Sequence, residues 1–124
     1  MEDINDISYK IIGCAFKVHR ELGPGLLEST YEVCLCYELT KAGVCFERQK
    51  ELSVVYDNMN LDTKYRIDLL VENRVIVENK SVKELSGIDK AQILSYMKLS
   101  KMKLGLLINF NVLDLKQGIN RFIN

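Results

Sequence analysis

The sequence has little proline and little glycine, with one and seven residues among 124, while 48% of its residues are hydrophobic. This composition excludes collagen-like and disordered chains, and a chain of this length buries roughly two-thirds of its unfolded surface. We therefore expect one globular domain over residues 1–124, with a core that needs no disulfide or metal. The four cysteines are interpreted as free thiols, because Cys34-x-Cys36 lacks the second ligand pair of a zinc site.

Long hydrophobic runs are also missing, since no apolar stretch approaches the roughly 20 residues that cross a bilayer. The N-terminus is acidic where a secretory signal would be basic and then apolar. We therefore expect a cytoplasmic protein with no membrane partner. The single histidine, His19, would have to serve any Ser–His or Cys–His catalytic pair, and we interpret it instead as a partly exposed residue near a helix end.

The net charge is zero, with 17 basic and 17 acidic side chains, and this argues against a strongly basic nucleic-acid-binding protein. The charges are nevertheless segregated along the chain. Residues 1–79 carry a net charge of −5, and residues 80–103, with six lysines, carry +4. Two interpretations stay open for this lysine-rich segment, namely a solvated helix face or a surface for a nucleic-acid backbone.

The spacing of apolar residues predicts the order α-α-β-β-β-α-β. Steps of three and four residues indicate helices over residues 4–22, 26–42 and 88–100. Val/Ile/Tyr-rich runs over 44–56 and 64–82 indicate three strands, with a polar turn at 57–60 and a hairpin loop at 72–74. The apolar run 104–110 indicates a buried strand, and residues 111–124 are assigned to no element. The predicted fold class is therefore α/β, with a central mixed sheet flanked by helices.

The three-residue hairpin loop at 72–74 sets the register of the strands that it joins. This register places Asp68 opposite Glu78 and Arg66 opposite Lys80, all on one face. Like charges directly opposed on a sheet are destabilising, and Mg²⁺ with water ligands would let both carboxylates stay ionised. Lys80 would then position a water nucleophile or stabilise charge on a phosphate. On spacing alone, a solvent-exposed hairpin with a cross-strand ion pair explains the pattern equally well.

Residues outside the hairpin favour the metal-dependent interpretation. Glu28 stands at the start of the second predicted helix, beside its apolar stripe, so its carboxylate can face inward. The expected inner side of the third helix carries Ile88, Ala91, Gln92, Tyr96 and Leu99. We expect Gln92 and Tyr96 to hydrogen-bond a nucleic-acid backbone, with adjacent lysines such as Lys90 and Lys98 contributing charge.

Five short motifs follow one another in a specific order and spacing. They are Gly25-Leu26-Leu27-Glu28-Ser29-Thr30-Tyr31, Arg66-Ile67-Asp68, Val77-Glu78-Asn79-Lys80, Ala91-Gln92-Ile93-Leu94-Ser95-Tyr96 and Gly105-Leu106-Leu107-Ile108-Asn109-Phe110. Over nearly the whole chain, they resemble the GxxExxY proteins, a group assigned to the PD-(D/E)XK nuclease-like superfamily.

This resemblance implies a restriction-endonuclease-like core, in which the active site lies where two strands diverge. It implies that Asp68 and Glu78 are metal ligands, together with the main-chain carbonyl of Asn79. Glu28 would match the extra acid of the RecB-like branch, as a further metal-site and catalytic residue, and Lys80 would be the catalytic lysine.

The leading hypothesis is a Mg²⁺-dependent nuclease, with Mn²⁺ as a substitute, that hydrolyses phosphodiester bonds in DNA, or secondarily RNA, through metal-activated water. Gln92 and Tyr96 would match the Q-x-x-x-Y element of the RecB-like branch and bind substrate with Lys90 and Lys98. The alternative is a catalytically silent nuclease-fold module for interaction or nucleic-acid binding. Because 124 residues offer little surface for gripping a long duplex, a homodimer is a further expectation.

Overall fold

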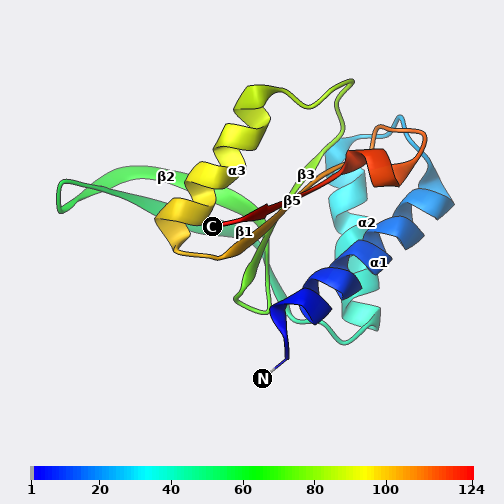
Figure 1. Cartoon of the computed structure of the whole chain (residues 1–124), viewed down its shortest axis with the longest axis horizontal. Helices are drawn as coiled ribbons and strands as arrows, with labels where there is room; N and C mark the ends of the chain where they lie inside the picture. Colours follow the sequence, from blue (N-terminus) through cyan, green and yellow to red (C-terminus); the bar gives the residue numbers. More distant parts are fainter. Residues whose placement is uncertain (1) are drawn as a thin grey trace.

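In the computed structural model, which describes residues 2–124, a five-stranded mixed sheet separates two helical layers (Figure 1). The elements are α1 (Ile4–Leu22), α2 (Glu28–Lys41), β1 (Phe46–Tyr56), β2 (Met59–Val71), β3 (Val75–Lys80), α3 (Gly87–Ser100), β4 (Leu104–Asn109), η1 (Leu115–Gly118) and β5 (Ile119–Ile123). The strand order is β1-β2-β3-β4-β5, with β3 and β4 parallel and the other neighbours antiparallel. The predicted α/β class and element order are confirmed, and the structure adds η1 and β5 in the tail.

One helical layer consists of α1 and α2, which cover the same face of the sheet (Figure 1). α1 begins after Asp3, whose carboxylate accepts a hydrogen bond from the main-chain N of Asn5 at 2.7 Å, and it ends at the left-handed Gly23. The ring of His19 donates a hydrogen bond to the main-chain carbonyl of Val112 at 2.7 Å, which ties α1 to the tail. None of the helices among residues 2–124 is both long and apolar enough to cross a membrane.

The other layer is α3, which packs on the opposite face through Ile93 and Met97. A Cβ atom at Gly105 of β4 would lie 2.7 Å from the Met97 sulfur, so the missing side chain lets the helix sit directly on the strand. Of the expected inner positions, Ile88, Ala91 and Leu99 are exposed, Ile88 by 77%, whereas Gln92 is half-buried and Tyr96 is buried. The expectation is therefore wrong for the first three residues, because α3 has apolar residues on more than one side and close packing on β4 selects the side that is buried.

Two hairpins arrange the first three strands. The β2–β3 pairs Leu69–Val77, Leu70–Ile76 and Val71–Val75 confirm the register predicted from the loop at 72–74. The β1–β2 turn is shorter than the predicted turn at 57–60. Asp57 and Asn58 have left-handed φ angles of 50° and 63°, which suit a two-residue hairpin turn, so Met59 already pairs with Tyr56.

Two asparagines are buried in the sheet, and they differ in how their amides are satisfied. Asn79 of β3 is 0% exposed, and neither its Oδ1 nor its Nδ2 has a hydrogen-bond partner among the described residues. Asn109 of β4 is 3% exposed, but its Oδ1 accepts from the main-chain N of Val82 and Asn111, and its Nδ2 donates to the Val82 carbonyl. Strand alternation places the Asn79 side chain on the face opposite Glu78.

We expect Asn79→Val to increase the free energy of unfolding by about 1–2 kcal/mol, because it removes a buried amide without partners and suits a strand. The matched Asn109→Val should decrease it by about 1–3 kcal/mol, since it leaves main-chain groups of the loop unsatisfied. Urea unfolding followed by circular dichroism measures both changes. A destabilised Asn79→Val variant would contradict the assignment.

Candidate active site

Asp68 and Glu78 lie where the β2–β3 ladder ends. The last paired residues are Leu69 and Val77, after which β2 continues beside β1. Two hydrogen bonds from main-chain N–H groups to side chains replace the ladder: the Glu78 carboxylate accepts from the main-chain N of Asp68 at 2.7 Å, and the Asp68 carboxylate accepts from the main-chain N of Asn79 at 2.8 Å. The structure thus brings the two acids together through reciprocal contacts to each other's strand.

The expected opposition of Arg66 and Lys80 does not form, because the two strands diverge beyond Leu69. Arg66 pairs instead with Glu51 of β1, and its guanidinium lies 3.8 Å from the Glu51 carboxylate. Lys80 is the last residue of β3, and its ammonium group donates to the Gln92 side-chain carbonyl at 3.5 Å. Lys80 therefore connects the sheet to α3 and has no cross-strand partner in β2.

Burial dominates the electrostatics of the two acids. Glu78 is only 4% exposed, and burial, followed by the negative charge of Asp68, raises its pKa to about 8. Burial also raises the pKa of Asp68 above its ordinary value, while the hydrogen bond from Asn79 lowers it. The positive charge of Lys80 lowers the pKa of both carboxyl groups, although not enough to offset burial. The single positive charge of Lys80 therefore does not compensate for the burial of the two carboxyl groups.

α3 contributes polar side chains on the Lys80 side of the site. Gln92 is half-buried and contacts Lys80, as described above. Tyr96 is buried one turn later, and its pKa is raised mainly by burial and also by the negative charges of Glu78 and Asp68. Lys90 and Lys98 lie on the exposed surface of the same helix. The helix therefore presents a polar inner edge and a basic outer surface.

The start of α2 approaches the site from the other side. Glu28 is its first residue, and it lines a surface hollow of about 470 Å³ together with Asp68. Glu28 is an exposed residue and is not buried inward as expected, but partial desolvation of its carboxyl group in the hollow raises its pKa, against the opposing charge of Lys80. Tyr31 fixes the preceding loop, because its hydroxyl donates to the Gly23 carbonyl at 2.6 Å, accepts from the main-chain N of Leu26 at 3.1 Å, and its ring stacks on Phe110.

A second group of polar residues at this hollow is absent from the sequence-based predictions. Glu32 of α2 is 5% exposed, and its carboxylate accepts from the Arg48 Nε at 2.5 Å and from the Gln49 amide at 3.1 Å to each oxygen. The Gln49 amide also reaches Asp68 Oδ1 at 3.4 Å. The helical spacing of Glu28 and Glu32 could have indicated an inward Glu32. No local pattern indicates Arg48 and Gln49, because their partners are distant in sequence.

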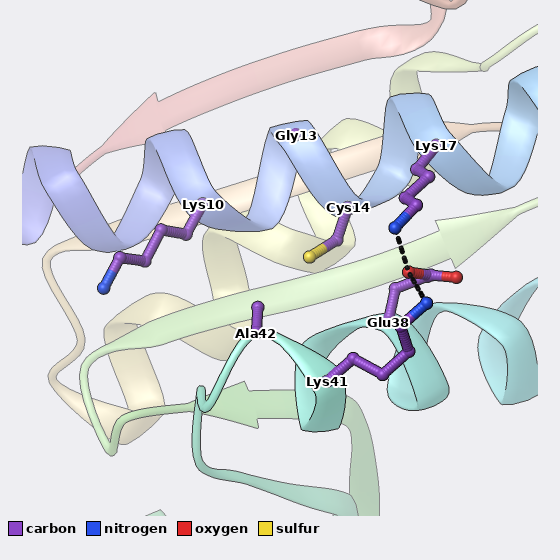
Figure 2. Close-up of a pocket in the computed structure, with 7 residues that line it drawn as sticks. All are labelled: Lys10, Gly13, Cys14, Lys17, Glu38, Lys41 and Ala42. Carbon is purple, nitrogen blue, oxygen red and sulfur yellow. Dashed lines mark ion pairs between the residues drawn. The ribbon is translucent and has the colours of Figure 1, made fainter.

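Another hollow lies between α1 and α2 (Figure 2). Its residues are Lys10, Gly13, Cys14, Lys17, Glu38, Lys41 and Ala42. Figure 2 shows the Glu38 carboxylate between two lysine ammonium groups, 3.2 Å from Lys17 and 3.7 Å from Lys41. Glu38 stands ten positions after Glu28, about 15 Å along the helix, so this hollow is separate from the acid pair. Its single carboxylate is already neutralised by lysines.

We expect the unfolding free energy of the metal-free protein to fall as pH rises between about 4.5 and about 8. A carboxyl group with a raised pKa binds more protons in the folded state than in the unfolded state over this window, so a rising pH favours unfolding. Glu78→Gln should flatten this slope and exceed the wild type by at least about 1 kcal/mol near pH 8.5. Urea titrations across this range provide the measurement.

Glu47→Gln, which removes an exposed carboxylate of β1, is the matched control for this titration and should keep the wild-type slope. Identical slopes for Glu78→Gln and the wild type would show that Glu78 does not carry the proton in the folded state.

Comparison with known proteins identifies a family for this fold and site. The model of the PD-(D/E)XK nuclease superfamily matches residues 5–122, nearly the whole chain. Searches of curated proteins and of solved structures gave no significant match. The narrower assignment to the GxxExxY proteins stays a prediction, whereas the mixed sheet and its flanking helices agree with a restriction-endonuclease-like fold. The chain therefore belongs to the PD-(D/E)XK nuclease superfamily.

Proposed function

We propose that this protein is a Mg²⁺-dependent nuclease that hydrolyses phosphodiester bonds in DNA. The observation that carries the proposal is the joined pair of buried acids at the point where β2 and β3 part, with Lys80 beside it. Membership of the superfamily supports a nucleic-acid substrate. The lysines of residues 80–103 favour the same partner, since phosphate contacts supply most of the affinity for DNA.

The donor groups at the acid pair suit Mg²⁺. This ion prefers oxygen ligands and is usually held by one or two carboxylates, with water or substrate oxygens completing its octahedron. Asp68 and Glu78 supply the carboxylates. The main-chain N–H of Asn79 points to Asp68, and in a strand the carbonyl of a residue points to the same side as its N–H. The carbonyl oxygen of Asn79 would therefore be a third ligand for the metal ion. Mn²⁺ shares these oxygen-ligand preferences.

The side chains of the protein would not complete the coordination of the metal ion by themselves. Among residues 2–124, no group of three or more His, Cys, Asp or Glu side chains is arranged to hold a metal ion. Two carboxylates and a main-chain carbonyl would therefore be completed by water and by the phosphate of the substrate. Glu28, in the hollow beside Asp68, is the further acid that we place at this site.

When bound, a divalent cation supplies Lewis-acid polarisation of the phosphate and lowers the pKa of water. The residues of the chain do the rest. The Lys80 ammonium group stabilises negative charge that develops on phosphate oxygens and orients the attacking water, and Gln92 fixes the position of that ammonium group. Tyr96, Lys90 and Lys98 contact the substrate backbone on the α3 side.

Asp68→Asn and Lys80→Met should each reduce Mg²⁺-dependent DNA cleavage by at least about 100-fold, because each removes a charge that acts on the reacting phosphate. Asp62→Asn and Lys116→Met remove exposed charges of the same types elsewhere in the chain and should cleave like the wild type. Cleavage of single-stranded DNA, duplex DNA and RNA by the purified proteins gives both activity and substrate class. Unchanged cleavage by both site variants would refute the proposal.

Metal binding can be tested without any substrate. Mn²⁺ or Mg²⁺ should raise the melting temperature of the wild type, since a ligand of the folded state stabilises it by about 2.7 kcal/mol at 100 times its dissociation constant. The shift should be absent in Asp68→Asn and retained in Asp62→Asn. A wild type that shows neither a shift at millimolar metal nor cleavage would favour the catalytically silent module.

A further inference from the structure

The backbone of β1 has an unusual conformation directly beside the acid pair. Gln49, within the strand, has a φ of 53°, in the left-handed region. The neighbouring ladder pairs are Arg48–Leu69 and Lys50–Ile67, so the irregular residue stands at the level of Asp68. A residue other than glycine held in this region costs about 1–3 kcal/mol and persists only where its surroundings fix it. The contacts of the Gln49 side chain explain why the backbone adopts this conformation.

The orientation of the Gln49 amide follows from its partners. Its Nε2 lies 3.1 Å from each carboxylate oxygen of Glu32 and 3.4 Å from Asp68 Oδ1. Ionised carboxylates only accept hydrogen bonds, so the NH₂ group, and not the carbonyl oxygen, must face both acids. One amide therefore bridges a buried acid of α2 and the candidate metal ligand on β2.

Glu32 is an anchor for this amide and is not itself free to bind a cation. Its carboxylate is 5% exposed, and both oxygens accept from Gln49 while Oε2 also accepts from Arg48. The guanidinium of Arg48 neutralises its charge at 2.5 Å. Burying this carboxylate is costly unless it is paired and hydrogen-bonded, and these two neighbours meet that requirement.

The Asp68 carboxylate is thus held at both oxygens. Its Oδ2 accepts from the main-chain N of Asn79, and its Oδ1 accepts from Gln49. One contact alone would leave the group free to rotate about its Cβ–Cγ bond, whereas two contacts from different strands fix its plane. A fixed carboxylate loses less entropy when it binds a cation.

We propose that Gln49 is a positioning residue, whose amide is anchored by Glu32 and sets the orientation of the Asp68 carboxylate for metal binding. This inference rests on the proposed function, in which Asp68 is a metal ligand. The left-handed backbone is the means by which the amide reaches both acids. The role is distinct from that of Lys80, because Gln49 acts through Asp68 and not on the substrate.

Gln49→Gly provides a sharp test, because glycine adopts the left-handed conformation without strain but lacks the amide. We expect Mn²⁺ affinity and kcat for DNA cleavage to fall by about 10-fold to 100-fold, as is usual when a group that orients a metal ligand is removed. The KM for DNA should stay within about twofold, since substrate contacts lie elsewhere. Calorimetric Mn²⁺ titration and steady-state kinetics give these values.

Asn58→Gly is the matched control, because Asn58 is also left-handed, with a φ of 63°, but lies in the β1–β2 turn. It should leave Mn²⁺ affinity and kcat unchanged. If Gln49 had a purely structural role, Gln49→Gly would lower the unfolding free energy together with kcat, and this result would also contradict the proposal. Gln49→Gly with wild-type Mn²⁺ affinity and kcat would overturn the proposal.

Amide hydrogen exchange in the metal-free protein separates this inference from the proposed function. The main-chain N–H of Asn79 donates to Asp68, so its protection reports how firmly that carboxylate is held. Gln49→Gly should reduce this protection by about 10-fold, while the core amide of Leu106 should be unaffected. If the wild type neither cleaves DNA nor binds Mn²⁺, the proposed function fails. Unchanged Asn79 protection in Gln49→Gly would overturn the positioning role by itself.

Discussion

The parting of β2 and β3 is the constraint on which the rest of the site depends. Where the ladder stops after Leu69 and Val77, the main-chain N–H groups of Asp68 and Asn79 lose strand partners and would be costly to bury unpaired. The carboxylates of Glu78 and Asp68 take the place of those partners. The hydrogen bonds that close the end of the ladder are therefore the same ones that hold two acids in a buried position.

Holding acids in this way has an electrostatic consequence. Burial raises the pKa of both carboxyl groups, that of Glu78 to about 8, so these groups bind a proton more readily than exposed carboxyl groups do. Lys80, two positions after Glu78 at the end of β3, supplies one positive charge. The site is thus acidic although the chain as a whole is neutral, and this local charge connects the geometry of the sheet to the metal-dependent chemistry that we propose.

Both helical layers are needed to complete this arrangement. The start of α2 brings Glu28 and Glu32 to the hollow, and Tyr31 holds the preceding loop in place by bonding its main chain. On the other face, close contact between α3 and β4 at Gly105 places Gln92 next to the ammonium group of Lys80. Acidic groups therefore come from the sheet and α2, and basic and amide groups come from β1, β3 and α3.

The sequence by itself determined the features that local patterns encode. Apolar periodicity indicated the helices, and the three-residue loop at 72–74 fixed the hairpin register, which put Asp68 and Glu78 side by side. Only the tertiary structure decided where the ladder ends, which side of α3 is buried, and that the Gln49 amide contacts both Glu32 and Asp68. Those outcomes depend on contacts between residues far apart in the chain and on a left-handed backbone that glutamine does not favour by itself.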